Sequence, residues 1–234
     1  MKRIFDSILF LTFFIFQHQH LYGQSVYTIK KNPFNAITIN GKGDATAWKS
    51  ANTLTHFIYP WEKTEAPATF FAALYDANWL YLLYKVNDDS VITFSNTTEK
   101  REIGRSDRVE IFFKVDDKMT PYYCLEMDAT GRIFDYRADY YRQMHYEWRW
   151  PTNQLTVKTS KTKDGYTLEA AISIPSLKTL GLLKDNILQA GIFRAECTGI
   201  ENGNPLLKWI SWIDPKSAGP DFHIPAAFGI LKLE

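Results

Sequence analysis

Apolar and polar residues alternate along most of the chain. Three segments show the pattern most clearly: residues 79–86 (WLYLLYKV), 108–115 (RVEIFFKV) and 165–175 (GYTLEAAISIP). Successive side chains of a β-strand point to opposite faces, so a period of two predicts half-buried strands. The expected core-facing residues are Leu80, Leu82, Tyr84 and Val86 in the first segment, Val109, Ile111, Phe113 and Val115 in the second, and Tyr166, Leu168, Ala170 and Ile172 in the third.

Further strand-like segments fill most of the remaining chain, separated by turn sequences such as ING, YDAN, DATG and TKDG. They cover residues 35–40, 68–76, 122–128, 132–138, 154–162, 188–196, 207–213 and 227–233. SIPSLKTLGL (173–182) predicts a short helix with Pro175 at its start. About a dozen strands with almost no helix predict an all-β fold, an antiparallel β-sandwich of jelly-roll type with one or two short helical turns.

The first residues read as an export signal. A basic start (MKRIFDS) is followed by an apolar run (ILFLTFFIF) and a polar tail (QHQHLYG). This order predicts a cleavable signal peptide over residues 1–23, a lead-in over 24–34 and one domain over 35–234. The apolar run is too short for a transmembrane segment, and no cysteine follows it that could carry a lipid anchor. We therefore expect a secreted or periplasmic protein.

The charge balance narrows the range of partners. The chain has 27 basic and 26 acidic residues, and removing Lys2, Arg3 and Asp6 with the signal peptide leaves 25 of each. Nucleic acids and anionic membranes are bound by a clustered excess of lysine and arginine. A neutral mature chain therefore argues against nucleic acid as a partner.

Five motifs resemble, in their order, those of the family 9 carbohydrate-binding modules. They are ITINGKGDATAW, YDANWLYLLYKVNDD, SDRVEIFFKV, GYTLEAAISIP and WISWIDP with PDFHIPAAFGILKL. The resemblance covers roughly residues 35–234. It implies a jelly-roll-like sandwich that binds sugars, carried on xylan-degrading glycoside hydrolases or secreted alone by Bacteroidetes. The expected function is non-catalytic carbohydrate binding in exported glycan or xylan catabolism, with glycoside hydrolases of the same pathway as partners.

The resemblance also implies a site. Members of the family that bind sugar hold a terminal glucose unit between two aromatic rings, and charged groups bond its hydroxyls. The first ring position falls on Gly104, which cannot stack, and the second falls on Phe222. The glutamate of the family's VEIF motif is Glu110, whereas the family's binding arginine falls near Tyr123. This departure puts the family's specific ligand, a free sugar end, in question.

Strand parity proposes polar neighbours for Glu110. The faces opposite the predicted core carry Arg108, Glu110, Phe112 and Lys114 in 108–115, Tyr122 and Glu126 in 122–128, and Arg194 and Glu196 in 188–196. If these strands share a sheet, Arg108, Glu126 and Arg194 join Glu110 in a polar floor that binds ligand. The alternative is a solvated face with cross-strand ion pairs worth about 0.2 to 1 kcal/mol each. Judged strand by strand, the residues favour the solvated face, except at Glu110.

Two aromatic segments offer rings for stacking. In PDFHIPAAFG, Phe222 would stack on a sugar and His223, largely neutral at pH 7, would hydrogen-bond to it. The alternative is that Phe222 plugs the end of the sandwich. In MHYEWRWP, Trp148 and Trp150 fall on the same side as Tyr146 and could replace the ring missing at position 104. Burial as core residues is an equally good reading for both tryptophans.

The sequence gives little support for catalysis or a bound cofactor. It has no HExxH, GxSxG or Gly-rich phosphate loop. Glu110 and Glu126 could supply a carboxylate pair, which leaves an accessory subunit with weak glycoside hydrolase activity as an alternative. No cofactor is predicted, although the acidic turns at 88–89 and 116–117 could hold calcium. No metal site can be assigned.

A second alternative is electron transfer. The wider structural relatives of this sandwich, the DOMON-like domains, include proteins that bind haem between side chains such as methionine and histidine. The mature chain offers His56, His145 and His223, and Met119, Met127 and Met144, but no CxxCH motif. Nothing in the sequence fixes a pair. A Soret band would distinguish this alternative from sugar binding.

The two cysteines are not expected to form a disulfide. Cys124 shares a strand face with Glu126, whereas Cys197 shares one with Phe193 and Ala195. Simple parity therefore points the two thiols to opposite sides of the sheets, although a β-bulge would reverse the assignment.

Overall fold

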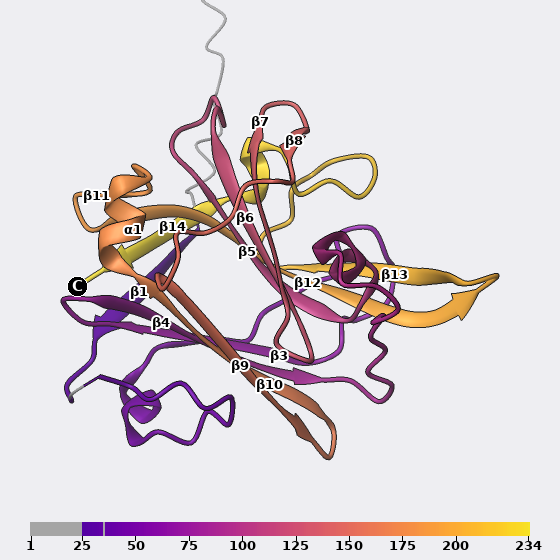
Figure 1. Ribbon diagram of the computed structural model, residues 1–234, viewed down its shortest axis with the longest axis horizontal. Helices are drawn as coiled ribbons and strands as arrows, with labels where there is room; N and C mark the ends of the chain where they lie inside the picture. The colour runs from indigo at the N-terminus through magenta and orange to yellow at the C-terminus, as the bar shows by residue number, and fades with distance from the viewer. Residues whose placement is uncertain (1–24, 35) are drawn as a thin grey trace, which may run out of the picture.

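The computed structural model describes residues 25–34 and 36–234. The predicted signal peptide, residues 1–23, lies outside the described residues. The chain forms two layers of strands that pack across a shared core (Figure 1). The predicted all-β sandwich is confirmed.

The first layer carries β5 and its neighbours. Its hydrogen-bonded order is β8 (Gln143–His145), β7 (Ile133–Asp139), β6 (Tyr122–Asp128), β5 (Arg108–Lys114), β12 (Ile187–Glu201), β14 (Gly229–Leu233) and β1 (Val26–Lys31). Two more strands, β11 (Leu183–Lys184) and β13 (Asn204–Ser211), pair with β12. The β12–β13 hairpin projects from the body of the fold (Figure 1).

The second layer continues from β1. Its order is β1, β3 (Thr69–Tyr75), β4 (Trp79–Asn87), β10 (Gly165–Ser173) and β9 (Leu155–Thr162), with β2 (Thr53–Leu54) beside β3. β1 pairs in parallel with both β14 and β3, whereas the other pairs of strands are antiparallel. The expectation of an antiparallel sandwich therefore holds for these layers except at β1, which connects them.

Helices are short. α1 (Ile174–Thr179) is the predicted helix: the Ser173 side chain accepts a hydrogen bond from the Ser176 amide, and Pro175 stands in the first turn. The 3-10 turns are η1 (Thr46–Ser50), η2 (Lys100–Arg105) and η3 (Pro225–Ala227). Within residues 25–34 and 36–234, no helix has the length and apolar character needed to cross a membrane.

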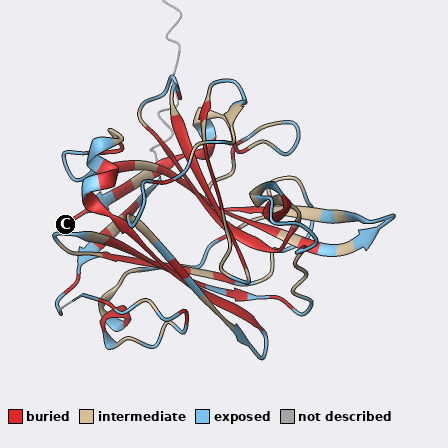
Figure 2. Cartoon of the chain, in the orientation of Figure 1, coloured by how far each residue is buried: buried red, intermediate tan, exposed pale blue. Residues whose placement is uncertain are grey.

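The main core lies between the two layers. Eleven of the twelve predicted core-facing residues are buried there, and Val115 is partly buried against the same cluster. In Figure 2 the buried residues follow the central strands of both layers, while the β12–β13 tip is exposed. The alternation in β4, β5 and β10 therefore identified the correct inner face.

The prediction of half-buried strands is wrong for β4, β5 and β10, because their outer faces are largely covered as well. On the second layer, the segment around η1 lies over Ala72, Leu83 and their neighbours. The carboxylate of Glu169, fully buried in β10, holds that segment in place by accepting hydrogen bonds from the Trp48 indole (2.8 Å) and the Gly41 amide (2.7 Å). This face was expected to be exposed to solvent, but the segment bound to the Glu169 carboxylate covers it.

The outer face of the first layer is covered by a second apolar cluster. Ile103 of η2 and Phe222, Ala227 and Phe228 of the segment before β14 pack onto strand residues such as Phe112. The prediction that charged residues make this face a solvated surface is therefore wrong. The face carries the candidate site described below.

Arg194 does not belong to that outer face. In the register of β12 and β5, Phe193 lies opposite Glu110 and Arg194 lies opposite Val109, so the Arg194 side chain points into the core. It is fully buried, and its Nη2 lies 2.9 Å from Asp88 Oδ2. The prediction of Arg194 as a ligand-binding residue is wrong, because side-chain parity within β12 does not fix which face meets its neighbours.

The free cysteines confirm the prediction of no disulfide, though not its reasoning. Cys124 lies opposite Phe112, which lies opposite Gly191 in β12. Phe193, whose face Cys197 was expected to share, lies on the same side of the layer as Cys124. Distance separates the thiols instead: Cys197 is six residues beyond Gly191, about 20 Å along the strand.

Replacing Arg194 by alanine should destabilise the protein strongly. The change leaves the buried Asp88 carboxylate without its partner, and breaking a buried pair in this way costs about 3 to 5 kcal/mol. Urea unfolding measures the difference. As control, Arg149→Ala removes a guanidinium that is 60% exposed and should shift the free energy of unfolding by about 0.5 kcal/mol or less. Equal effects of the two substitutions would contradict the assignment of Arg194 to the core.

Candidate functional site

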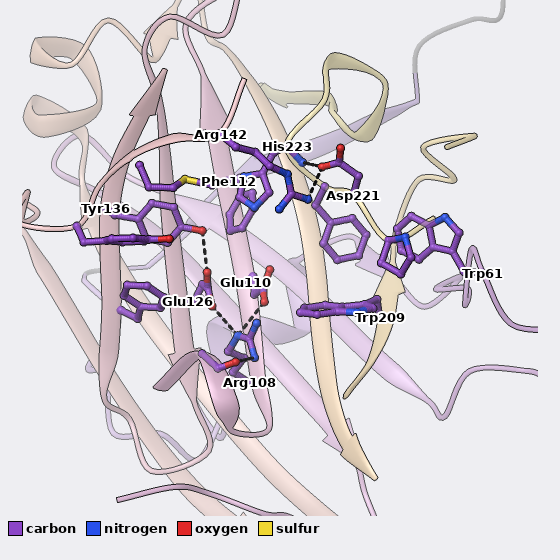
Figure 3. A pocket seen from close by; sticks show the side chains of 16 residues that line it. Trp61, Arg108, Glu110, Phe112, Glu126, Tyr136, Arg142, Trp209, Asp221 and His223 are labelled. Atoms are coloured by element: carbon purple, nitrogen blue, oxygen red, sulfur yellow. Dashed lines mark hydrogen bonds and ion pairs between the residues drawn. The ribbon is translucent and has the colours of Figure 1, made fainter. Parts of the chain in front are cut away.

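A cavity of about 260 Å³ lies on the outer face of the first layer. Its floor comes from β5 and β6, one wall from β13 and the segment before β14, and the other wall from β7 and the residues after β8 (Figure 3). The register of the sheet places many of the lining residues next to one another, because directly opposite residues of paired strands share a face.

The floor carries two glutamates and an arginine. Glu110 of β5 lies directly opposite Glu126 of β6, and Arg108 stands two residues before Glu110. Arg108 Nε lies 2.9 Å from Glu110 Oε1 and 2.6 Å from Glu126 Oε2. Its Nη1 donates to the Gly104 carbonyl oxygen at 2.8 Å. One guanidinium therefore holds both carboxyl groups side by side beneath the cavity.

These charges are buried and incompletely bonded. Arg108, Glu110 and Glu126 expose only 3%, 1% and 5% of their surface. The Tyr136 hydroxyl donates to Glu126 Oε1 at 2.8 Å. No residue in the described part of the chain donates a well-directed hydrogen bond to the Glu110 carboxyl, whose only close polar contact is Arg108. Glu110 thus retains capacity to bond a ligand.

Burial sets the protonation of the floor. It raises the pKa of Glu110 to about 8, against the effect of Arg108 and with that of the Glu126 carboxylate. At neutral pH the Glu110 carboxyl therefore carries a proton and can donate a hydrogen bond as well as accept one. For Arg108, burial lowers the pKa, but the Glu126 and Glu110 carboxylates outweigh burial and hold the pKa above its usual value.

One wall is built from a cluster of four aromatic rings. Phe222 stacks on Phe193 with ring centroids 4.0 Å apart, and its other neighbours are Trp61 at 5.4 Å and Trp209 at 6.0 Å. Trp209 also lies beside the floor, 5.3 Å from the Arg108 guanidinium carbon. Trp61 and Trp209 remain partly exposed, so their rings face the cavity.

Glycine 191 permits this stack. A Cβ at position 191 would lie 2.2 Å from the Phe193 ring, far inside contact distance. The absence of a side chain lets the Phe193 ring lie over β12, where Phe222 covers it. A substitution at Gly191 would displace Phe193 and with it the wall.

The opposite wall consists of Phe134, Tyr136 and Tyr146. Their ring centroids lie 4.8 to 5.7 Å from one another. Phe134 is the register partner of Glu126, which explains why this wall rises directly from the floor. Only Tyr146 is partly exposed. A Cβ at Gly104 would lie 3.4 Å from the Phe134 ring, so the missing side chain there leaves the cavity open beside this wall.

His223, Arg142 and Asp221 form the rim. His223 Nδ1 lies 3.0 Å from the Tyr122 hydroxyl, and Arg142 Nη2 donates to Asp221 Oδ1 at 2.8 Å. Burial, together with the nearby Arg142 guanidinium, lowers the pKa of His223 to about 4, although the Asp221 carboxylate opposes the shift. The imidazole is therefore neutral at pH 7, as predicted. Such a cavity suits a ring with apolar faces and a hydroxylated edge, because rings flank it and donors and acceptors lie below.

The sequence profile of the family described as carbohydrate family 9 binding domain-like matches residues 39–234. The chain belongs to this family. The resemblance found in the five motifs is thereby confirmed. No curated protein sequence matches the chain.

Three solved structures of family 9 type or similar fold agree with the architecture. A candidate carbohydrate-binding protein from Bacteroides uniformis has 18% sequence identity and a TM-score of 0.67 over 90% of this chain and 100% of its own. A family 9 module from Caldicellulosiruptor kristjanssonii has 19% identity over 90% of this chain. Its complex with cellotriose gives a TM-score of 0.55 over 94% of that chain, and its complex with glucose 0.56 over 96%. At this identity the likeness concerns the fold.

The family 9 fold brings five of the residues that the sequence singled out to one cavity. They are Arg108, Glu110, Glu126, Phe222 and His223. Phe222 is 5% exposed and packs face to face on Phe193, so it supports the wall more than it offers a free ring. Of the two alternatives that the sequence left open for Phe222, a packed residue fits these contacts better than a free stacking ring.

Trp148 and Trp150 do not line the cavity. Trp150 is buried in the main core, and its indole donates to Ser176 Oγ at 3.1 Å. Trp148 packs on Tyr123 at 5.0 Å, against the same core. Their prediction as a stacking platform is wrong, because β8 ends at His145 and a turn follows. Period-two alternation does not continue through that turn.

Sequence reasoning missed or undervalued several residues of the family 9 cavity. Neither Trp209 nor Trp61 was among the predicted site residues, yet both line the cavity. Arg142 lies between β7 and β8, and Asp221 lies between β13 and β14. No local sequence pattern predicts the contact between them. The alternation of Trp209 with Ile210 could have identified Trp209, had the register of β13 been known.

No metal or haem site can be assigned. Within the part of the chain that the structure describes, no three histidine, cysteine or acidic residues group as metal ligands. Asp88, one of the predicted calcium ligands, is paired with Arg194. Met144 Sδ and His223 Nδ1 both approach the Tyr122 hydroxyl, at 3.9 and 3.0 Å. Because His223 is hydrogen-bonded there, this pairing alone gives no support to the haem alternative.

Replacing Glu110 by glutamine should make stability less dependent on pH. The folded pKa of about 8 exceeds the ordinary value of 4.5, so the stabilising contribution of protonated Glu110 is complete below about pH 4.5 and is lost as pH rises through 8. Glutamine keeps the shape without titrating. Thermal unfolding should therefore show Glu110→Gln gaining melting temperature relative to the native protein as pH rises from about 5 to 9. Parallel curves would contradict the buried acid, and the exposed Glu99→Gln serves as control.

Proposed function

We propose that this chain binds carbohydrate without catalysis and takes one sugar ring into the cavity. The observation that carries the proposal is the Arg108, Glu110 and Glu126 group, buried beneath a cavity with partly exposed tryptophans on its wall. The apolar face of a pyranose stacks on an aromatic ring, and its hydroxyls need fixed donors and acceptors. Arg108 and protonated Glu110 supply donors, while Glu126 supplies an acceptor.

The comparisons support the same ligand class. The chain belongs to the carbohydrate family 9 binding domain-like family, and a module of similar fold was solved with glucose and with cellotriose. Together with the signal-like residues 1–23, this supports a role outside the cytoplasm in glycan breakdown, with xylan as one candidate. Glycoside hydrolases of the same pathway are the proposed partners.

The floor favours binding over hydrolysis. Glycosidases place one carboxyl group on each side of the scissile bond. Here Glu110 and Glu126 are direct cross-strand neighbours and share one guanidinium, so both lie beneath the ligand. We therefore expect no release of reducing sugar from bound glycans.

An array of xylan, cellulose, pectin and host glycans, followed by affinity gels, tests the proposal. Specific retention of the protein by at least one glycan is expected. Retention by none would overturn the proposed function. An absorbance spectrum of the same preparation should show no Soret band, and a stoichiometric band would favour haem binding instead.

Replacing Trp209 by alanine should weaken binding to the retained glycan by about 1 to 3 kcal/mol, the range measured for the loss of one aromatic stacking partner. Trp209 is partly exposed, so the fold should survive. Titration calorimetry measures the affinity. The matched control is Trp79→Ala, which removes a partly exposed tryptophan packed on the outer cluster of the second layer. Equal affinity of the Trp209 variant and the native protein would place the site elsewhere.

A further inference from the structure

The cavity is small for an oligosaccharide. Its volume of about 260 Å³ lies below the roughly 300 to 1,000 Å³ of clefts that enclose drug-sized ligands. If the proposed function holds, one sugar ring occupies the cavity, and any further sugar units of the glycan must extend across the rim of the cavity. The residues outside the rim therefore decide whether the protein recognises a single unit or a chain.

Two exposed tyrosines stand at that rim. Tyr140 and Tyr141 lie in the connection between β7 and β8, and they expose 45% and 50% of their surface. Their rings contact each other edge to face with centroids 5.4 Å apart. Single exposed apolar residues are common on protein surfaces, whereas adjacent rings at the edge of a cavity form a patch that a ligand can cover.

Tyr140 and Tyr141 are held in place beside the cavity by contacts with neighbouring residues. The Tyr141 hydroxyl donates to Asp221 Oδ2 at 2.5 Å, and the Arg142 guanidinium carbon lies 5.5 Å from the Tyr141 ring centroid. Asp221 and Arg142 both line the cavity. On the other side, the Tyr140 amide donates to the Met119 carbonyl oxygen at 3.0 Å. Rings already held in place lose little freedom when a ligand covers them, which favours affinity.

We propose that Tyr140 and Tyr141 form a second stacking subsite for the sugar units that follow the one in the cavity. The ligand is then an oligosaccharide or polysaccharide chain rather than a monosaccharide. Arg142 and Asp221, which separate the two places, present charged groups to the hydroxyls of the connecting unit. This inference rests on the proposed function and specifies its ligand class.

Affinity measured against chain length tests the subsite. Titration calorimetry uses glucose, cellobiose, cellotriose and cellotetraose, and the matching series from xylose to xylotetraose. The native protein should bind the tetrasaccharide of at least one series about tenfold more tightly than its monosaccharide, equivalent to about 1.4 kcal/mol. In the double variant Tyr140→Ala with Tyr141→Ala, this ratio should fall close to one.

Two further variants separate stacking from hydrogen bonding and from general effects. Tyr141→Phe keeps the ring and loses the hydroxyl bond to Asp221, so it should retain most of the gain with length. Phe34→Ala removes a ring that is 59% exposed in the N-terminal segment, and it should leave the ratio unchanged. If the double variant does not fold, the single variant Tyr140→Ala carries the test.

Three outcomes overturn the inference. Monosaccharide and tetrasaccharide binding with equal affinity to the native protein means that no second subsite exists, although the proposed function stands. If affinity still increases with the number of sugar units after both tyrosines are removed, the glycan lies on another part of the rim. Absence of binding to both series contradicts the subsite for these chains, and the glycan array then decides separately on the proposed function.

Discussion

The contacts of the Arg108 guanidinium with the Glu110 and Glu126 carboxyl groups are the constraint on which the site depends. Removing the Arg108 and Glu126 charges and the polar Glu110 carboxyl from water is unfavourable, and buried ion pairs often contribute little to stability. They are buried nevertheless, because Phe222, His223, the β7–β8 connection and η2 cover the outer face of β5 and β6. The cover is incomplete and leaves a cavity in which Glu110 lacks a directed donor. We interpret the Glu110 carboxyl as a buried polar group that is positioned to form hydrogen bonds with a ligand.

The sequence predicted the fold well because the inner faces of β4, β5 and β10 are apolar at every second position. Leu80, Leu82 and Tyr84 needed no knowledge of their neighbours to be assigned to the core. The covers of the outer faces could not be predicted in the same way. Glu169 in β10 has the pattern of an exposed residue. Its burial is explained by hydrogen bonds from the Trp48 indole and from the Asn40 and Gly41 amides, more than a hundred residues away in sequence.

The sequence identified some of the residues that line the cavity. The mistaken predictions have a common origin. Arg108, Glu110 and Glu126 meet at one cavity, as expected, because they alternate within two strands that pair directly. Arg194 was wrong because alternation within β12 gives two sets of residues without saying which set faces β5, and only the register of Phe193 with Glu110 decides it. Trp148 failed for a related reason, since a turn interrupts the alternation. Pairing between strands is a tertiary property, and the chain carries no local signal for it.

Tryptophan indole resonances provide the most direct test of the central claim that the ligand lies between these walls and above this floor. In a ¹⁵N-labelled sample titrated with an oligosaccharide that the chain binds, the Nε1–H signals of Trp209 and Trp61 should shift. Those of Trp48 and Trp150, whose indoles are bonded to Glu169 and Ser176 in other parts of the fold, should remain in place. Shifts confined to Trp48 or Trp150, with Trp209 and Trp61 unaffected, would contradict the account.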